Sequence, residues 1–164
     1  MIIRAIAILL LAAMASGCSN RATATWAPGA DPSKLKTFYV VHQPRDKENL
    51  HQMMSDQLSL KGLKSTFGPE LPAGSYKTDA VITYVDKWMW DITLYLLELT
   101  VTVRDPAGNT LAVGNSYHTS LTRLSPTEMV TEVLGNIFGW RNRPVAKEKP
   151  EKANGSVGFT PRGP

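Results

Sequence analysis

The stretch that decides the fold is DAVITYVDKWMWDITLYLLELTVTVRDPAGNTLAVGNSYHTSL, residues 79–121. It holds three long runs of strand-forming residues, at 79–90, 92–104 and 110–121. DPAGN, residues 105–109, joins the last two runs with residues typical of a hairpin turn. The sequence therefore predicts a β-meander at the centre of the protein.

The middle run shows which face of this sheet is buried. Apolar and polar residues alternate along it: Leu97, Leu99, Val101 and Val103 against Glu98, Thr100, Thr102 and Arg104. Successive side chains of a strand point to opposite faces, so this pattern predicts one buried and one wet face. A sheet with one wet face is expected to be antiparallel and covered on one side only.

Two predicted helices, one before and one after the meander in the sequence, supply the cover. Residues 46–61 have apolar positions at helical spacing, between predicted strands at 37–42 and 63–67, and residues 68–75 are rich enough in Pro and Gly to be a loop. Ser125, Pro126 and Glu128 are typical of a helix start, and Gly139 of a helix end. We therefore predict an α+β domain over residues 35–140, with a mostly antiparallel sheet of about five strands and two helices on one face. Its elements follow the order β-α-β-β-β-β-α.

The first eighteen residues, MIIRAIAILLLAAMASGC, have the three parts of a secretory signal. Arg4 precedes an apolar run, and small residues precede Cys18. The uncharged run is shorter than the ~20 residues of a membrane-spanning helix. The end of this segment resembles the lipobox of bacterial lipoproteins, with Ala15 where leucine is most common. An ordinary signal peptide with a chance cysteine is the alternative.

The lipobox resemblance implies cleavage before Cys18, so that residues 1–17 are a signal peptide and Cys18 carries the acyl chains. The chain is thus similar to small Gram-negative envelope lipoproteins with uncharacterised α+β domains. Ser19 favours the outer membrane, facing the periplasm, in enterobacterial lipoproteins, while other bacteria sort by other positions and leave inner-membrane retention open. Residues 18–34 have the composition of a flexible tether between the anchor and the domain.

The net charge of the 164 residues, 18 − 14 = +4, comes from the chain ends. Residues 141–164 carry six basic and two acidic side chains, which is +4, and Arg4 adds one, so residues 18–140 sum to −1. We expect no nucleic-acid partner for such a domain. Residues 141–164 are predicted to be a disordered basic tail, and its binding to peptidoglycan or anionic lipid is a separate hypothesis.

Catalytic or metal-binding patterns are weak. The three histidines, His42, His51 and His118, lie on different elements without metal-ligand spacing, and we expect neither a metal nor a cofactor. Asp86 and Asp91 are an odd number of residues apart, which places them on opposite faces of one strand. We therefore predict that the protein is not an enzyme. The alternative is a hydrolase acting on an envelope polymer, with His118 or Asp86 as catalytic groups.

Tyr84, Trp88 and Trp90 stand at even spacing on one predicted strand and share a face. They either pack beneath a helix or the 68–75 loop, or form an aromatic patch that binds a lipid, a glycan or a partner strand. The sequence favours a membrane-anchored, non-catalytic binding or assembly module of the cell envelope. Its expected partners are the membrane, through Cys18, and an envelope protein, glycan or lipid.

Overall fold

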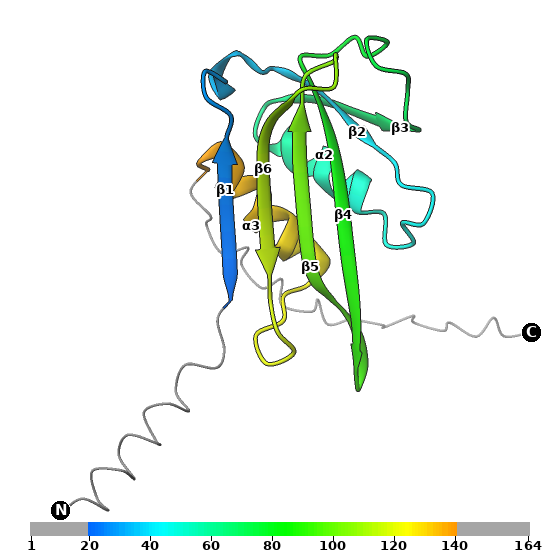
Figure 1. Cartoon of the computed structure of the whole chain (residues 1–164). Helices are drawn as coiled ribbons and strands as arrows, with labels where there is room; N and C mark the ends of the chain where they lie inside the picture. Colours follow the sequence, from blue (N-terminus) through cyan, green and yellow to red (C-terminus); the bar gives the residue numbers. More distant parts are fainter. Residues whose placement is uncertain (1–19, 141–164) are drawn as a thin grey trace, which may run out of the picture.

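A computed structural model describes residues 20–140 of the chain. One six-stranded sheet, in the order β1-β6-β5-β4-β2-β3, carries two helices on one face (Figure 1). The strands are β1 (Arg21–Trp26), β2 (Thr37–Val41), β3 (Lys64–Gly68), β4 (Ala80–Asp91), β5 (Thr93–Arg104) and β6 (Thr110–Tyr117). The helices are α2 (Leu50–Leu60) and α3 (Pro126–Phe138), and Pro32–Lys34 form a short 3-10 turn, η2. The predicted α+β class is confirmed. The predicted signal peptide, the lipidated Cys18 and the basic tail lie outside the described residues.

The sheet is mixed, because two of its five pairings are parallel. Strands β1, β6, β5 and β4 pair antiparallel with their neighbours, as expected for the meander. Strand β2 pairs in parallel with both β3 and β4. The first of these pairings follows from the crossover through α2, which returns the chain to the starting end of β2.

Strand β1 corrects the prediction of a flexible tether over residues 18–34 and raises the strand count from about five to six. It pairs with β6 along its whole length, from Arg21 opposite Tyr117 to Trp26 opposite Ala112. The Trp26 Nε1–H donates to the Ile137 carbonyl at the end of α3, at 2.6 Å. The ordered body therefore begins well before Leu35.

The core lies between the sheet and the two helices. Side chains from α2, α3 and the facing strands are almost fully buried there, among them Leu50, Met54, Leu58, Ile82, Leu99, Val101, Met129, Val133 and Leu134. Gly114 of β6 lets α3 approach closely, since a Cβ at this position would lie 2.6 Å from Ile137 Cγ1. Both helices cover the same face of the sheet, as predicted.

Most predicted boundaries agree with the structure to within a residue or two. Helix α3 begins with the expected capping box between Ser125 and Glu128 and ends at Gly139. Helix α2 begins at Leu50 and not at residue 46, because the Asp46 side chain turns inward and Asn49 takes a left-handed conformation. Strand β6 stops at Tyr117, four residues early, where His118 leaves the sheet to bond with Thr122 and Glu132.

The predicted alternation in β5 holds for Leu99, Val101 and Val103, which are buried. Leu97 is only half-buried, since the β4–β5 register shifts by one residue between Lys87 and Trp88. This bulge changes which β5 residues face the core, so that Leu96 and not Leu97 lies opposite Trp88 on the helix side. Beyond the bulge Leu96 and Tyr95 are still buried, and the exposed end begins with Met89 and Leu94.

Candidate functional site

The β4–β5 hairpin runs past the ends of the helices and ends in an exposed apolar turn (Figure 1). We call residues Met89–Leu94 the hairpin tip. Its large apolar side chains are exposed: Met89, Trp90, Ile92 and Leu94. Trp90 is 72% exposed and Ile92, the single residue between the two strands, is 87% exposed. The tip thus presents to solvent the residue types that usually fill a core.

Ile92 makes the turn with a positive φ of 61°. This left-handed region favours glycine or asparagine, and a β-branched residue there costs about 1–2 kcal/mol. A hairpin optimised for stability alone would carry a different residue at this position.

The three aromatic residues predicted to share a face do so, but the helices cover them to different extents. Tyr84 is 2% exposed and lies in the core. Trp88 is half-buried and packs against the edge of the core, while Trp90 lies beyond the helices. These residues therefore form a line that runs from the interior to the tip, and only its outer part is accessible.

A groove of about 410 Å³ lies beside the tip on the helix side. Its lining comes from the loop before α2, the hairpin and the start of α3: Glu48, Trp88, Thr93, Leu94, Tyr95, Leu96, Arg123, Leu124, Ser125 and Pro126. The lining combines aromatic and aliphatic side chains with one acidic residue, Glu48, and one basic residue, Arg123. Such a lining suits an amphipathic ligand.

Arg123 fixes one wall of the groove. It belongs to the segment 118–125 between β6 and α3, which we call the β6–α3 loop. Its Nη1–H donates to Thr93 Oγ1 at 2.7 Å, its Nε–H donates to the Ser120 carbonyl at 3.0 Å, and its guanidinium lies 4.8 Å from the Tyr95 ring centroid. The hairpin and this loop therefore form one surface.

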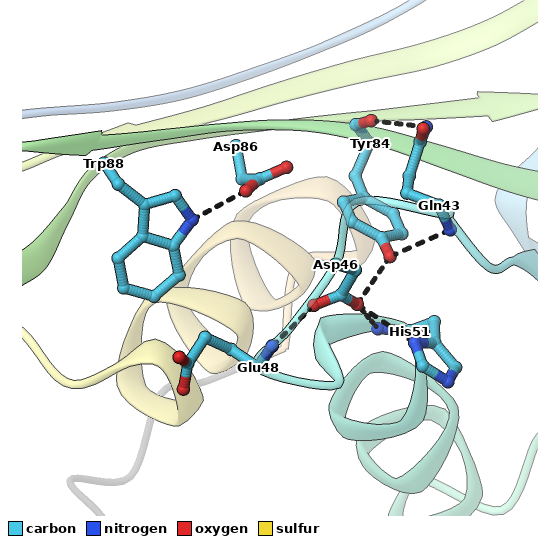
Figure 2. A network of polar contacts seen from close by, with 7 residues as sticks. All are labelled: Gln43, Asp46, Glu48, His51, Tyr84, Asp86 and Trp88. Atoms are coloured by element: carbon cyan, nitrogen blue, oxygen red, sulfur yellow. Dashed lines mark hydrogen bonds and ion pairs between the residues drawn. The ribbon is translucent and has the colours of Figure 1, made fainter.

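A network centred on Asp46 supports the other wall (Figure 2). The Asp46 side chain is 1% exposed. Its Oδ2 accepts a hydrogen bond from the Tyr84 hydroxyl at 2.7 Å and lies 2.9 Å from His51 Nδ1. The backbone N–H groups of His51 and Glu48 donate to the same carboxylate, at 3.3 and 3.0 Å. This network ties the loop before α2 to the middle of β4.

The electrostatics of the network follow from these contacts. Burial alone would raise the pKa of the Asp46 carboxyl, but the hydrogen bonds from His51 and Tyr84 outweigh it and hold that pKa below its ordinary value. Burial, together with the bond to Asp46, raises the pKa of Tyr84 far above its ordinary value. Asp46 is therefore a carboxylate, and Tyr84 a neutral donor, at physiological pH.

Asp86 and Asp91 lie on opposite faces of β4, as their spacing predicts. Asp86 Oδ2 accepts a hydrogen bond from Trp88 Nε1 at 2.6 Å, which fixes the indole at the groove (Figure 2). Asp91 is exposed at the tip. The structure does not bring these two carboxylates together.

His118 is buried, and both of its ring nitrogens contact acceptors. Nε2 lies 2.8 Å from Glu132 Oε2 and Nδ1 lies 3.1 Å from the Thr122 carbonyl oxygen. The Ser116 hydroxyl donates to the same Glu132 oxygen at 2.6 Å. This cluster joins β6 to α3. The rings of His42 and His51 contact each other in a tilted arrangement, with centroids 4.1 Å apart and an angle of 41° between the ring planes. Within residues 20–140, there is no group of three or more His, Cys, Asp or Glu side chains that is able to hold a metal ion.

Asp46, Ile92, Arg123 and Glu132 were not identified as site residues from the sequence. For Ile92 a signal existed, since an apolar residue stands between two long strand runs where turn residues are normal. Each of the other three residues has a partner on another element, namely Tyr84 for Asp46, Thr93 for Arg123 and Ser116 for Glu132, and sequence spacing does not reveal these contacts.

Together these observations define an α+β domain with an exposed apolar hairpin and an adjoining groove. No protein-family model matches the sequence, and no curated protein matches it. Among solved structures the fold is similar to that of a variant of PelC from Paraburkholderia phytofirmans, whose structure is a dodecamer. The TM-score is 0.52 and the identity 13%, and the match covers 75% of this chain and 99% of the PelC chain. This likeness shows a shared fold.

Within the described residues, neither helix has the length and hydropathy needed to cross a bilayer.

Proposed function

We propose that this protein is a membrane-anchored lipoprotein that faces the periplasm, preferentially from the outer membrane, and acts as a non-catalytic binding or assembly module of the cell envelope. The observation that carries the proposal is the exposed apolar tip beside a groove with an aromatic wall. Isolated soluble domains expose few contiguous apolar patches, and larger ones mark binding sites. The lipobox at Cys18 supplies the location.

The polar groups favour binding over catalysis. His118 bonds through both ring nitrogens to a carbonyl and to Glu132, and Asp86 bonds to the indole of Trp88. A general acid or base needs an accessible atom within reach of its substrate. These contacts instead hold β6 to α3 and orient Trp88. The hydrolase alternative predicts that His118→Ala or Asp86→Ala alters cell-wall or lipid profiles at unchanged protein level, and we expect no such change.

Photocrosslinking in cells tests the binding function. A photoreactive amino acid replaces Glu48 in the groove or Trp90 at the tip, and a control replaces Val85, which is exposed on the opposite face of the sheet. We expect a defined crosslinked product from Glu48 or Trp90, and none from Val85. Equal products at all three positions, or no product at any, would contradict the proposal.

Self-association is one form that assembly can take. The structurally similar PelC chain forms a dodecamer, and β1 and β3 each leave one edge of the sheet unpaired within residues 20–140. Native mass spectrometry of the full chain in detergent measures this directly. We expect a single defined oligomer, whereas a monomer at all concentrations would point to binding of a different molecule.

A further inference from the structure

The start of the described chain and the hairpin tip lie at the same end of the sheet. Strand β1 begins at the end where the β4–β5 hairpin turns (Figure 1). The Thr122 hydroxyl, in the β6–α3 loop, donates to Asn20 Oδ1 at 2.5 Å. Cys18 precedes Asn20 by two residues, so its Cα lies within about 7 Å of the Asn20 Cα. A lipid anchor at Cys18 therefore attaches at this end of the domain.

The strand register gives the relative reach of the anchor and the tip. Arg21 lies opposite Tyr117, which lies opposite Glu98 of β5. Ile92 is six residues beyond Glu98 along the hairpin, which at about 3.3 Å per residue, and allowing for the bulge, is roughly 17–20 Å. Cys18 is three residues before Arg21 and reaches at most about 11 Å in the same direction. The tip therefore extends farther toward the anchored side than the anchored residue itself.

The chemistry of the tip fits the interfacial layer of a bilayer. Trp90 is an aromatic side chain of the kind that gathers at headgroup level, and Met89, Ile92 and Leu94 are apolar. Leu121 in the β6–α3 loop is also exposed at this end. The Lys87–Glu98 ion pair, at 2.7 Å, lies farther from the apex, whereas Arg123 bonds to Thr93 Oγ1 of the tip, directly after Ile92. Asp91 is the charged residue within the tip, and it stands beside the turn.

We propose that the hairpin tip inserts into the interfacial layer of the phospholipid bilayer that holds the Cys18 acyl chains, with Ile92 and Trp90 as its main contacts. This inference rests on the lipid anchor of the proposed function. It makes the hairpin a second point of attachment, which fixes the orientation of the domain and holds the groove next to the membrane surface. Insertion to a depth of about 5–10 Å suffices to cover these side chains.

The test uses the full chain, processed in cells and reconstituted into phosphatidylethanolamine–phosphatidylglycerol vesicles. Cys18 is the only cysteine, and acylation blocks its thiol, so Ile92→Cys introduces a single site for an environment-sensitive fluorophore. Leu60→Cys is the matched control, because Leu60 is 75% exposed at the last residue of α2, outside the hairpin end. Far-UV circular dichroism of both labelled chains checks the fold. Lipids carrying a quencher near the headgroup report depth.

At position 92 we expect a blue shift of the emission and its loss with quencher lipids, and at position 60 the emission of a water-exposed probe. A water-like, unquenched probe at position 92 in protein that floats with the vesicles overturns the inference and leaves the anchor intact. A shielded probe at position 92 that lipid quenchers do not reach also overturns it, since a protein or a second copy then covers the tip. If the chain does not float with the vesicles and mass spectrometry of its N-terminal peptide shows no acyl chains, the proposed lipid anchor at Cys18 is contradicted as well.

Discussion

Replacing Ile92 by asparagine should stabilise the folded domain. Ile92 adopts a φ of 61°, which costs a β-branched residue about 1–2 kcal/mol but is readily adopted by asparagine. The Ile92 side chain is 87% exposed, so the substitution removes little burial within the domain. The net expectation is a gain of about 1 kcal/mol in the free energy of unfolding. For a domain of this size that raises Tm by about 4 °C.

Thermal and urea unfolding of a soluble form that begins at Ser19 measure this gain. Ile92→Val is the matched control, because valine keeps the β-branch and hence the strain, and its stability should stay close to that of the native chain. A loss of stability in Ile92→Asn, or an equal gain in Ile92→Val, would refute the argument from backbone conformation.

The same substitution separates stability from function. An asparagine at the apex removes the most exposed apolar side chain of the tip. In the anchored full chain of this more stable variant, quencher-carrying lipids should therefore quench the fluorescence of Trp90 less than in the native chain. Such an opposition is common where a residue is kept for binding and not for folding. Unchanged quenching by lipids would argue that Ile92 is a tolerated defect of the turn.

Three further predictions concern the core. Tyr84→Phe removes the hydroxyl that donates to the Asp46 carboxylate at 2.7 Å. It should lower the free energy of unfolding, measured by urea titration, by about 1.5–3 kcal/mol. A loss of less than a few tenths of a kcal/mol would contradict a buried charge-assisted hydrogen bond. The pKa of Asp46 is lowered in the folded state, so its stabilisation is present above the unfolded value of about 3.9 and is lost as the pH falls through the folded value. Asp46→Asn should therefore be less stable at neutral pH and lose part of this acid dependence below about pH 5, and parallel stability–pH curves for the two chains would count against it. Gly114→Ala places a methyl group 2.6 Å from Ile137 Cγ1 and should cost about 1–3 kcal/mol, seen as a lower Tm; an unchanged Tm would show that α3 moves freely relative to β6.

Local patterns were sufficient for the elements whose signals are local. The capping box of α3 and the alternation in β5 depend on neighbours in the sequence; the first prediction is confirmed, and the second is confirmed for Leu99, Val101 and Val103 but not for Leu97 beside the bulge. Strand β1 was missed because RATATW contains no large apolar residue before Trp26. Its stability comes from pairing with β6 and from the bond between Trp26 and Ile137, which lie far away in the chain.

The site was predictable in part for the same reason. The even spacing of Tyr84, Trp88 and Trp90 on a strand correctly placed them on one face. That spacing does not show which of the three the helices cover and which remain exposed. The bulge beside Trp88 depends on the pairing of two strands and leaves no clear mark in either. The line of aromatic residues was therefore visible in the sequence, while the boundary between its structural and accessible parts was not.

Strand β1 also bears on the order in which the domain folds. Arg21 and Tyr117 pair although they are 117 − 21 = 96 residues apart. Closing so long a loop is entropically costly, and the cost is recovered only once the rest of the sheet offers an edge to pair with. We therefore expect the local hairpins of β4, β5 and β6 to form early and β1 to join last. In an exported chain, the segment that emerges first would complete the fold last, and the residues beside Cys18 would stay accessible to processing enzymes until then.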